Sequence, residues 1–487
     1  MKKYSLLIGS LILLAAVSAL FTFILKPAPQ LSRENELIRL AGPPSALGRL
    51  KPRSAKKPRF VASASKRMVR TNSGLAKYEP ARGAYLGAAL DYTRLAGAGT
   101  NQDKLATVMR SWENESGRQH AIYVQFIAFP ETDGLFPSWN TDSKDWATAA
   151  DFCNAAASLN AAPLLTLEPK RPEIFLDWRE GAPAYEATRT FALAAGRWGK
   201  PLFIRFGHEM NGSWYPWNEW NDKNRNLRRD PGEDTGFTAG DYRRAYRNVA
   251  LMFRRYAPNA ALVWCPNSGL LGGGRRDPFA PFYPGDDVVD WVALDFYERG
   301  WTMPMPGAKL WGGQFGHNLT NDAADDSSTA RNESVNFYQT YAVKKNKPLM
   351  VGETGATLSY RTDLPADQRA IMNHEWKTGY WNTSEYGWMQ SAYGTSAFKG
   401  QPVLQPIDKA FPRLKAIVWF QIAKREDLPV EAMRDGQRHV KWYDNVYVDY
   451  RIGGSVEENG ARPFAQQEIE LYRKLTDTPY FLSGIVK

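Results

Sequence analysis

Ile204-Arg205-Phe206-Gly207-His208-Glu209-Met210-Asn211-Gly212-Ser213-Trp214-Tyr215-Pro216-Trp217 is the segment from which the rest of this sequence is best interpreted. The apolar run 201–206 that leads into it predicts a buried strand. The charged and aromatic residues that follow are costly to bury unless something uses them. The segment therefore indicates a carboxylic acid at a strand end, in a cleft that binds sugar rings.

Seven further apolar runs accompany this one from residue 81 onward. They are near-continuous rather than alternating, as in strands that are buried on both faces of a parallel sheet. With the run above, the eight predicted strands are 84–90, 121–128, 163–168, 202–208, 261–265, 288–296, 349–353 and 415–421.

Helical periodicity falls between most of these runs, and 238–256 is its clearest case. There Thr238 and Asp241 form a capping-box pattern ahead of apolar residues at helical spacing. Other helices are predicted at 101–114, 143–159, 183–198, 332–345, 364–380 and 464–475. Eight strand–helix units predict an α/β fold, a (β/α)₈ TIM barrel with enlarged βα loops. A doubly wound open sheet is the alternative, weakened because no Gly-rich dinucleotide loop follows the first run.

Polar and aromatic residues gather where the predicted strands end, which is where barrel enzymes place their chemistry. Two of these residues, Glu209 and Glu353, are glutamates at comparable depth on the fourth and seventh strands. Glycoside hydrolysis uses such a pair, about 5–5.5 Å apart in retaining enzymes and about 6.5–9.5 Å apart in inverting ones.

The opening segment resembles the fourth-strand signature of glycoside hydrolase family 26. Four later segments resemble that family in the same order, so that the resemblance spans roughly residues 81–475. These segments are Val263-Trp264-Cys265-Pro266-Asn267, the run from Tyr283 to Trp291 that leads to Tyr297, Lys347-Pro348-Leu349-Met350-Val351-Gly352-Glu353, and Ile417-Val418-Trp419-Phe420.

The resemblance implies a barrel that cleaves β-mannan, or mixed-linkage β-glucan or xylan, with retention of configuration. It implies Glu209 as acid/base and Glu353 as nucleophile. Trp214 would supply apolar surroundings that raise the pKa of the acid. Trp214 and Trp419 would be sugar platforms.

Other residues receive supporting roles by the same resemblance. His208 would orient Glu209 or contact substrate, Tyr297 would hydrogen-bond the nucleophile, and Arg205 would hold the carboxylates in place. The remaining substrate-site candidates are Trp217, Asn267 and Glu168.

Several candidates have a structural alternative. A supporting hydrogen bond is favoured over substrate contact for Glu168 and, similarly, for Asn267, and a scaffold role is expected for Asp295. Tryptophans in the long predicted loops could be sugar platforms or packing anchors; they are Trp301, Trp311, Trp381 and Trp388. The large segments 219–236, 300–331 and 357–413 could turn a groove into a tunnel.

Charge is concentrated in one part of the chain. The net charge is +11, but residues 26–80 alone hold 13 Lys or Arg against three acidic residues, which leaves the body from 81 onward nearly neutral. A neutral body argues against a nucleic-acid partner. No cofactor is predicted, and no metal site, because no pair of the five histidines has ligand spacing. Cys153 and Cys265 are expected to be buried and unpaired.

The sequence predicts three regions: 1–25, 26–80 and 81–487. Residues 1–25 contain an apolar run long enough to span a bilayer, which predicts an uncleaved membrane anchor or, alternatively, a cleaved signal peptide. Residues 26–80 predict a basic, disordered linker. The catalytic barrel of 81–487 is then expected outside the cytoplasm, in the periplasm or at the cell surface, as a monomer.

Two functional hypotheses follow. The first is a retaining endo-β-glycanase acting on a polysaccharide. The second is a non-catalytic, membrane-tethered polysaccharide-binding or assembly protein, and transglycosylation by the same carboxylates is a further alternative.

Overall fold

The computed structural model describes most of the chain beyond its first 73 residues. The predicted anchor 1–25 and most of the predicted linker lie outside the described part. Within that part, no helix is both long and apolar enough to cross a bilayer. The described residues are 74–93, 95, 98–129, 148–268, 277–298, 314–320, 335–356, 358–360, 380–398, 401–434, 437–453, 455–456, 460–461 and 465–486.

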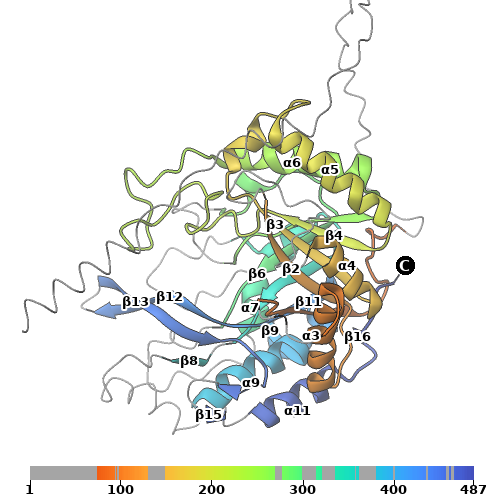
Figure 1. Cartoon of the computed structure of the whole chain (residues 1–487). Helices are drawn as coiled ribbons and strands as arrows, with labels where there is room; N and C mark the ends of the chain where they lie inside the picture. The colour runs from red at the N-terminus through yellow and green to blue at the C-terminus, as the bar shows by residue number, and fades with distance from the viewer. Residues whose placement is uncertain are drawn as a thin grey trace, which may run out of the picture. The chain divides into compact units, whose positions relative to one another are not determined.

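Eight parallel strands form a closed barrel in the described chain (Figure 1). The first and last of them pair in register from Tyr85–Ala416 to Leu90–Gln421, which closes the sheet. This closure confirms the predicted barrel and excludes the open sheet. The strands are β1 (Ala84–Leu90), β2 (Ile122–Ala128), β3 (Ala162–Glu168), β4 (Leu202–Phe206), β5 (Ala260–Trp264), β6 (Trp291–Asp295), β7 (Leu349–Thr354) and β11 (Leu414–Gln421).

Helices follow most of these strands. Those that match predicted helices are α3 (Asn101–Ser116), α4 (Ala149–Ser158), α5 (Pro183–Trp198), α6 (Ala239–Tyr256), the π-helical η4 (Tyr338–Val343) and α11 (Ala465–Thr476). Shorter elements are η1 (Pro172–Leu176), η2 (Ala280–Phe282), α7 (Gln314–Thr320) and α10 (Ile407–Ala410). The predicted helix 364–380 lies, apart from its last residue, outside the described residues.

Helix α6 shows why the sequence forms these elements. The Thr238 hydroxyl accepts the Asp241 N–H at 3.1 Å, and the Asp241 carboxylate accepts the Thr238 N–H at 3.0 Å, so the predicted capping box is confirmed. Its buried face includes Tyr242, Val249 and Phe253, at helical spacing. Burying such a face against the barrel supplies most of a helix's stability.

Strand side chains divide into two clusters, one inside the barrel and one between barrel and helices. On β4, Phe203 and Arg205 point inward, whereas Ile204 and Phe206 pack outward. This alternation follows from the two-residue period of a strand. It brings every second side chain of each strand into the barrel, including those nearest the carboxyl ends.

The predicted linker boundary at residue 80 is wrong, because residues 74–80 pack against the amino ends of the strands. Lys77 donates to the carbonyls of Pro258 and Ala260, and the Tyr78 ring packs edge-on against Phe203 at 5.8 Å. Glu79 is buried and ion-pairs with Arg413 at 2.6 Å. The sequence of residues 74–80 has no periodic apolar pattern. Its position is set by contacts with residues far away in the chain.

The segment after β7 holds more structure than its predicted loop. It contains α9 (Tyr380–Tyr393), whose Trp388 is buried and donates to the Thr354 hydroxyl at 3.1 Å. Trp388 is therefore a packing anchor. Strand β8 (Leu358–Tyr360) and the hairpin β9 (Thr395–Phe398) and β10 (Gln401–Pro406) belong to the same segment.

A long hairpin that the sequence did not predict follows β11 and projects from the barrel (Figure 1). Its strands β12 (Ala423–Arg434) and β13 (Gln437–Asp449) pair antiparallel, and β8 joins the edge of β13. The short strands β14 (Ser455–Val456), β15 (Gly460–Ala461) and β16 (Phe481–Leu482) complete the described elements. Both cysteines are buried and free, as predicted.

A buried histidine generates a prediction about acid stability. His120 is wholly buried, and its Nε2 accepts the Trp112 indole N–H at 3.1 Å and lies 3.0 Å from the Tyr472 hydroxyl. Burial lowers the pKa of His120 to about 3. The unfolded chain binds a proton at this histidine below about pH 6.5 and the folded chain does not, so stability must fall as pH falls.

We expect His120 to remove about 1.4 kcal/mol of unfolding free energy for each pH unit below about 6. Urea unfolding of wild type and of His120→Gln between pH 5 and pH 7.5 measures this. The variant, although less stable at neutral pH, should lose stability less steeply on acidification. Equal slopes would refute the assignment.

Candidate active site

The turn that follows β4 presents Glu209 in an unusual backbone conformation. Gly207 and Glu209 have φ of 54° and 51°, in the left-handed region that a glutamate enters only at a cost of about 1 kcal/mol or more. The turn is pinned on both sides, because the Glu209 N–H donates to the Cys265 carbonyl at 2.8 Å and its carbonyl accepts from Asn218 at 2.9 Å. Strain of this kind is typical of functional sites.

Asn218 organises this turn, and sequence interpretation missed it. Its side-chain oxygen accepts the N–H groups of Trp214 at 2.8 Å and Tyr215 at 2.7 Å, while its amide holds Glu209. The residue is fully buried. Its position, four residues beyond Trp214 and directly after the Ile204–Trp217 segment, was the available signal.

Both carboxylate oxygens of Glu209 accept hydrogen bonds. Asn267 donates to one at 2.6 Å, and the indole N–H of Trp214 donates to the other at 3.0 Å. Asn211 fixes Asn267 by two 2.8 Å hydrogen bonds to its backbone. The structure thus brings two separately predicted site residues, Trp214 and Asn267, to Glu209.

Glu353, at the end of β7, is held by two donors. The Arg205 guanidinium lies 2.6 Å from one of its oxygens, and the Tyr297 hydroxyl donates to the other at 2.6 Å. Burial, with the charge of Glu353, raises the pKa of Tyr297 well above its usual range, so the phenol stays protonated and remains a donor. The Arg205 and Tyr297 contacts are those that the sequence predicted for Glu353.

Arg205 is buried inside the barrel and links two carboxylates. It contacts Asp295 at 3.1 Å as well as Glu353, and its Nε donates to Thr166 at 2.9 Å. Burial alone would disfavour the charged form, but Asp295 and Glu353 raise the pKa of Arg205 well above its usual range. Arg205 is therefore a permanent cation under the site, a position from which it cannot contact a substrate directly.

Gly352 makes room for this ion pair. A Cβ on Gly352 would lie 2.5 Å from an Asp295 oxygen and 2.8 Å from the Arg205 guanidinium. Cys265 donates its thiol proton to Asp295 at 3.0 Å. Burial raises the pKa of Asp295 well above its usual range, and the nearby Glu353 and Glu209 add to this effect. Asp295 thus serves as a scaffold, as expected.

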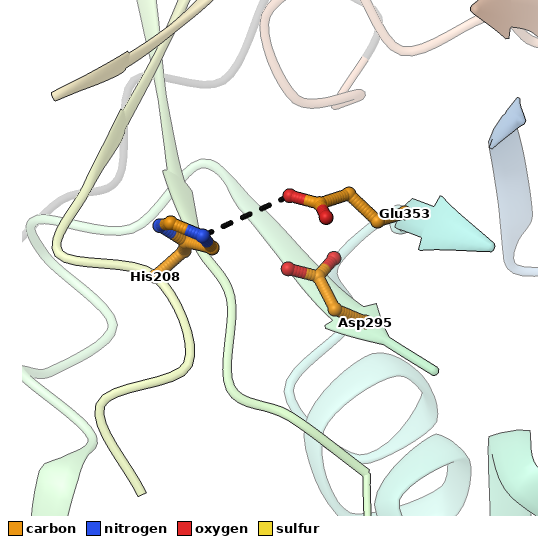
Figure 2. A group of neighbouring side chains, drawn as sticks. All are labelled: His208, Asp295 and Glu353. Carbon is orange, nitrogen blue, oxygen red and sulfur yellow. Dashed lines mark ion pairs between the residues drawn. The ribbon is translucent and has the colours of Figure 1, made fainter. Parts of the chain in front are cut away.

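His208 faces the same two carboxylates (Figure 2). Its Nε2 lies 3.8 Å from Glu353 and 3.3 Å from the Tyr215 hydroxyl. Burial lowers the pKa of His208 well below its usual range, with Arg205, Lys170 and Lys424 adding to the effect. A neutral imidazole makes this contact with Glu353 a polar contact rather than an ion pair.

Two groups of residues have ligand types that metals use. In the first, ligand atoms of His208, Asp295 and Glu353 lie within 4.8 Å of one another (Figure 2). Arg205 already supplies the positive charge for both carboxylates there. The second is in the loop after β4, where side-chain oxygens have the spacing of an EF-hand calcium loop at Asp222, Asn224, Asn226, Asp230 and Glu233.

In the second group, the carboxylates of Asp222 and Glu233 accept hydrogen bonds from backbone N–H groups of the same loop. Leu227 has φ of 58° at the position where an EF-hand carries glycine. Asp222 accepts the N–H groups of Asn226 and Leu227, and Glu233 accepts those of Lys223, Asn224 and Asp230. These carboxylates thus shape the loop.

The prediction of direct sugar contact is wrong for two tryptophans. Trp419 is fully buried, points outward from β11 toward Tyr393 of α9, and donates to the Tyr450 carbonyl. Trp217 is also fully buried, donates to the His208 carbonyl at 2.7 Å and stacks on Tyr215 at 4.2 Å. Both support the site from behind. Trp214, 44% exposed, has an accessible face.

Phe420, next to Trp419, occupies the inward position that the prediction gave to the tryptophan. Its ring lies edge-on to those of Phe126 and Tyr297 at 6.5 and 5.7 Å. The signal for Phe420 was the alternation of side chains along β11, which points residues 416, 418 and 420 inward. Glu168 ion-pairs with Lys170 at 2.8 Å, near Trp217.

Comparison with known proteins gives distant relatives. No protein-family model matches the chain. Among curated proteins, it is 26% identical over 220 residues to Endoglucanase H of Acetivibrio thermocellus, covering 45% of this chain and 21% of that protein. It is 27% identical over 188 residues to Beta-1,3-xylanase TXYA of a Vibrio species, covering 36% and 29%. The chain thus spans less than a third of these relatives.

The solved structures with a similar arrangement include two family 26 mannanases. One is the catalytic domain of a GH26 endo-β-1,4-mannanase of Bacillus sp. JAMB-750, at 16% identity, a TM-score of 0.45 and coverage of 82% of this chain and 87% of that one. Another is the modular endo-β-1,4-mannanase of Cellulomonas fimi, at 17% identity, a TM-score of 0.44 and coverage of 83% and 73%.

Arg205 yields a stability prediction. Arg205→Met leaves Asp295 and Glu353 buried without their cation, which should cost about 3–5 kcal/mol at pH 8. Lower pH allows Asp295 to be neutralised by a proton, so the deficit should shrink toward pH 5. Denaturant unfolding at both pH values measures it.

Arg179→Met is the matched control, because the Arg179–Asp177 pair is exposed at the surface. An exposed pair contributes about 0–1 kcal/mol. The prediction would be contradicted if Arg205→Met lost as little unfolding free energy as Arg179→Met, or if its loss were the same at both pH values.

Proposed function

We propose that this chain is a retaining glycoside hydrolase of the family 26 type, acting on a β-linked polysaccharide. The observation that carries the proposal is the unequal support of Glu209 and Glu353 at one mouth of the barrel. Glu353 is held from below by Arg205 and Tyr297, whereas Glu209 is presented on a strained turn beside the exposed Trp214.

Glu353 has the surroundings of a nucleophile. A nucleophilic carboxylate must carry its charge in the resting enzyme, and Arg205 and Tyr297 satisfy that charge with short hydrogen bonds. Glu353 nevertheless keeps 6% of its surface exposed, while Arg205 and Asp295 are fully buried. Of this ion-paired group, Glu353 is thus the member open to a substrate.

Glu209 has the surroundings of an acid/base. It is also 6% exposed and is hydrogen-bonded by Trp214 and Asn267, both of which are partly exposed. A general acid must reach the leaving-group oxygen and then return as a base, so it needs a solvent path. The charges of Glu209 and Glu353 both raise the pKa values of Tyr215 and Asp295, which supports a shared centre for the two glutamates.

β-Mannan is the proposed first substrate, followed by mixed-linkage β-glucan and xylan. The motif resemblance supports mannan, and the names of the curated relatives support glucan and xylan. The indole of Trp214 offers a flat apolar face beside Glu209, as sugar binding requires. The apolar segment 6–25 supports action outside the cytoplasm.

Substitution of the two glutamates tests the mechanism. On an aryl β-glycoside, Glu353→Ala should lose on the order of 10⁵-fold in kcat. Glu209→Ala should lose roughly 10²- to 10⁴-fold on polysaccharide, and less on a substrate with a good leaving group.

Added azide separates the two roles. A retaining enzyme without its acid/base should give the β-glycosyl azide, and one without its nucleophile the α-glycosyl azide, as nuclear magnetic resonance would show. Wild-type rates for either variant on mannan and glucan would sink the proposal. Binding of oligosaccharides without turnover would favour the non-catalytic alternative.

Trp214 variants test the platform. Trp214→Phe keeps an aromatic face but loses the N–H donated to Glu209, so kcat should fall with KM nearly unchanged. Trp214→Ala also loses stacking worth about 1 kcal/mol or more, so KM should rise as well. Steady-state kinetics on a defined oligosaccharide distinguishes these outcomes, and an unchanged KM in Trp214→Ala would remove Trp214 from the substrate site.

A further inference from the structure

Two insertions rise from opposite sides of the barrel mouth. One is residues 207–238, between β4 and α6, and the other is the β12–β13 hairpin, which follows β11. In the closed strand order β11-β7-β6-β5-β4-β3-β2-β1, β4 and β11 are four strands apart in either direction. A contact between these insertions therefore joins opposite sides of the mouth.

Arg225 makes that contact. Its guanidinium donates to Asp444 at 2.5 Å and to Asp427, and it lies 4.9 Å from the centre of the Trp442 ring. The Trp442 indole N–H donates to the Arg225 carbonyl at 2.6 Å. Side chain and backbone of one residue are thus held by three hairpin residues, and we refer to these four residues as the Arg225 bridge.

The loop is built to present Arg225 in this position. Arg225 and Leu227 have φ of 60° and 58°, a conformation that costs free energy for both residue types. Asp222 accepts the Leu227 N–H at 2.8 Å, and the buried Glu233 accepts the Lys223 N–H at 3.0 Å. The direction of Arg225 therefore comes from the loop backbone and not only from a flexible side chain.

The hairpin is joined at its base to the residues around Glu353. Tyr450, just after β13, donates to Glu426 of β12 at 2.5 Å, and its ring lies 4.9 Å from Tyr297. Tyr297 in turn donates to Glu353. Strand β8, which closely follows β7 and Glu353, pairs with β13. The hairpin thus rises from the nucleophile side, and the Arg225 loop from the acid/base side.

We propose that the Arg225 bridge passes over the catalytic carboxylates, so that a polysaccharide reaches them by threading a free chain end beneath it. This inference rests on the proposed function and names the mode of action of the same site. An open groove accepts the middle of a chain, as the sequence resemblance to endo-acting enzymes implies. A barrel mouth that is spanned by the Arg225 bridge accepts only chain ends.

The bridge is weak enough to be opened by one substitution. Its ion pairs are 39–67% exposed at the side chains, and such pairs each contribute little. Arg225→Ala removes both ion pairs and the ring contact without touching Glu209, Glu353 or their donors. It should shift the balance between closed and open mouths about fivefold or more toward open.

The experiment compares viscosity loss with the release of reducing ends on a soluble polysaccharide that the wild type cleaves. Chain-end cleavage releases reducing ends with little loss of viscosity, whereas internal cleavage lowers viscosity early. The wild type should show a low ratio of viscosity loss to reducing ends released, and Arg225→Ala should show a ratio several-fold higher. Its kcat/KM on a short oligosaccharide should stay within about twofold, because the catalytic contacts are unchanged.

Arg228→Ala is the matched control, because Arg228 is an exposed arginine in the same loop and its removal changes the net charge by the same amount. It should leave the ratio at the wild-type value. Arg225→Glu combined with Asp427→Lys and Asp444→Lys restores opposite charges and should lower the ratio again. A structural role for Arg225 in loop folding would not be rescued in this way.

Equal, high ratios for wild type and Arg225→Ala would overturn the inference and leave the proposed function intact. The same holds if Arg225→Ala and Arg228→Ala change the ratio alike. If the wild type cleaves no β-glycan, the proposed function fails, and the inference fails with it.

Discussion

A guanidinium buried inside a β-barrel is the constraint on which this structure depends. Arg205 has no exposed surface, and a lone buried cation would cost several kcal/mol. Its charge is tolerable only because Asp295 and Glu353 come to it from two other strands. This requirement fixes the mutual positions of β4, β6 and β7 at their carboxyl ends. It also explains a glycine at 352, where a side chain would strike the ion pair.

The same constraint makes two glutamates chemically unequal. Glu353 belongs to the buried ionic group and shares its cation, so its environment is set by the barrel interior. Glu209 lies outside that group, on a turn whose backbone strain is held by Asn218 and the Cys265 carbonyl. Identical side chains thus receive opposite support, one from a fixed charge and one from a partly exposed indole and amide. The proposed acid/base and nucleophile roles depend on this difference in environment between two residues of the same type.

Around this centre the barrel supplies a frame, and two insertions extend from its mouth. Tyr297, which donates to Glu353, packs with Phe420 and Tyr450 at the base of the hairpin. The loop after β4 starts from the strained turn at Glu209. Each insertion is therefore anchored to one of the two glutamates, and a contact between insertions is also a contact between the two halves of the site.

The sequence by itself determined the eight strands, most of their helices, and the position of Glu209 and Glu353 at strand ends. These follow from local periods of apolar residues and from polar residues at strand ends, which neighbouring residues encode. The contacts of Arg205 and Tyr297 with Glu353 were expected from the family resemblance of the motifs, and the structure contains both. Tertiary structure alone decided that Trp217 and Trp419 are buried, that residues 74–80 pack below the strands, and that Arg225 meets the hairpin. Each of these depends on contacts between residues far apart in the chain. Composition and local pattern do not specify which partner a side chain meets, because that partner is set only when the barrel closes.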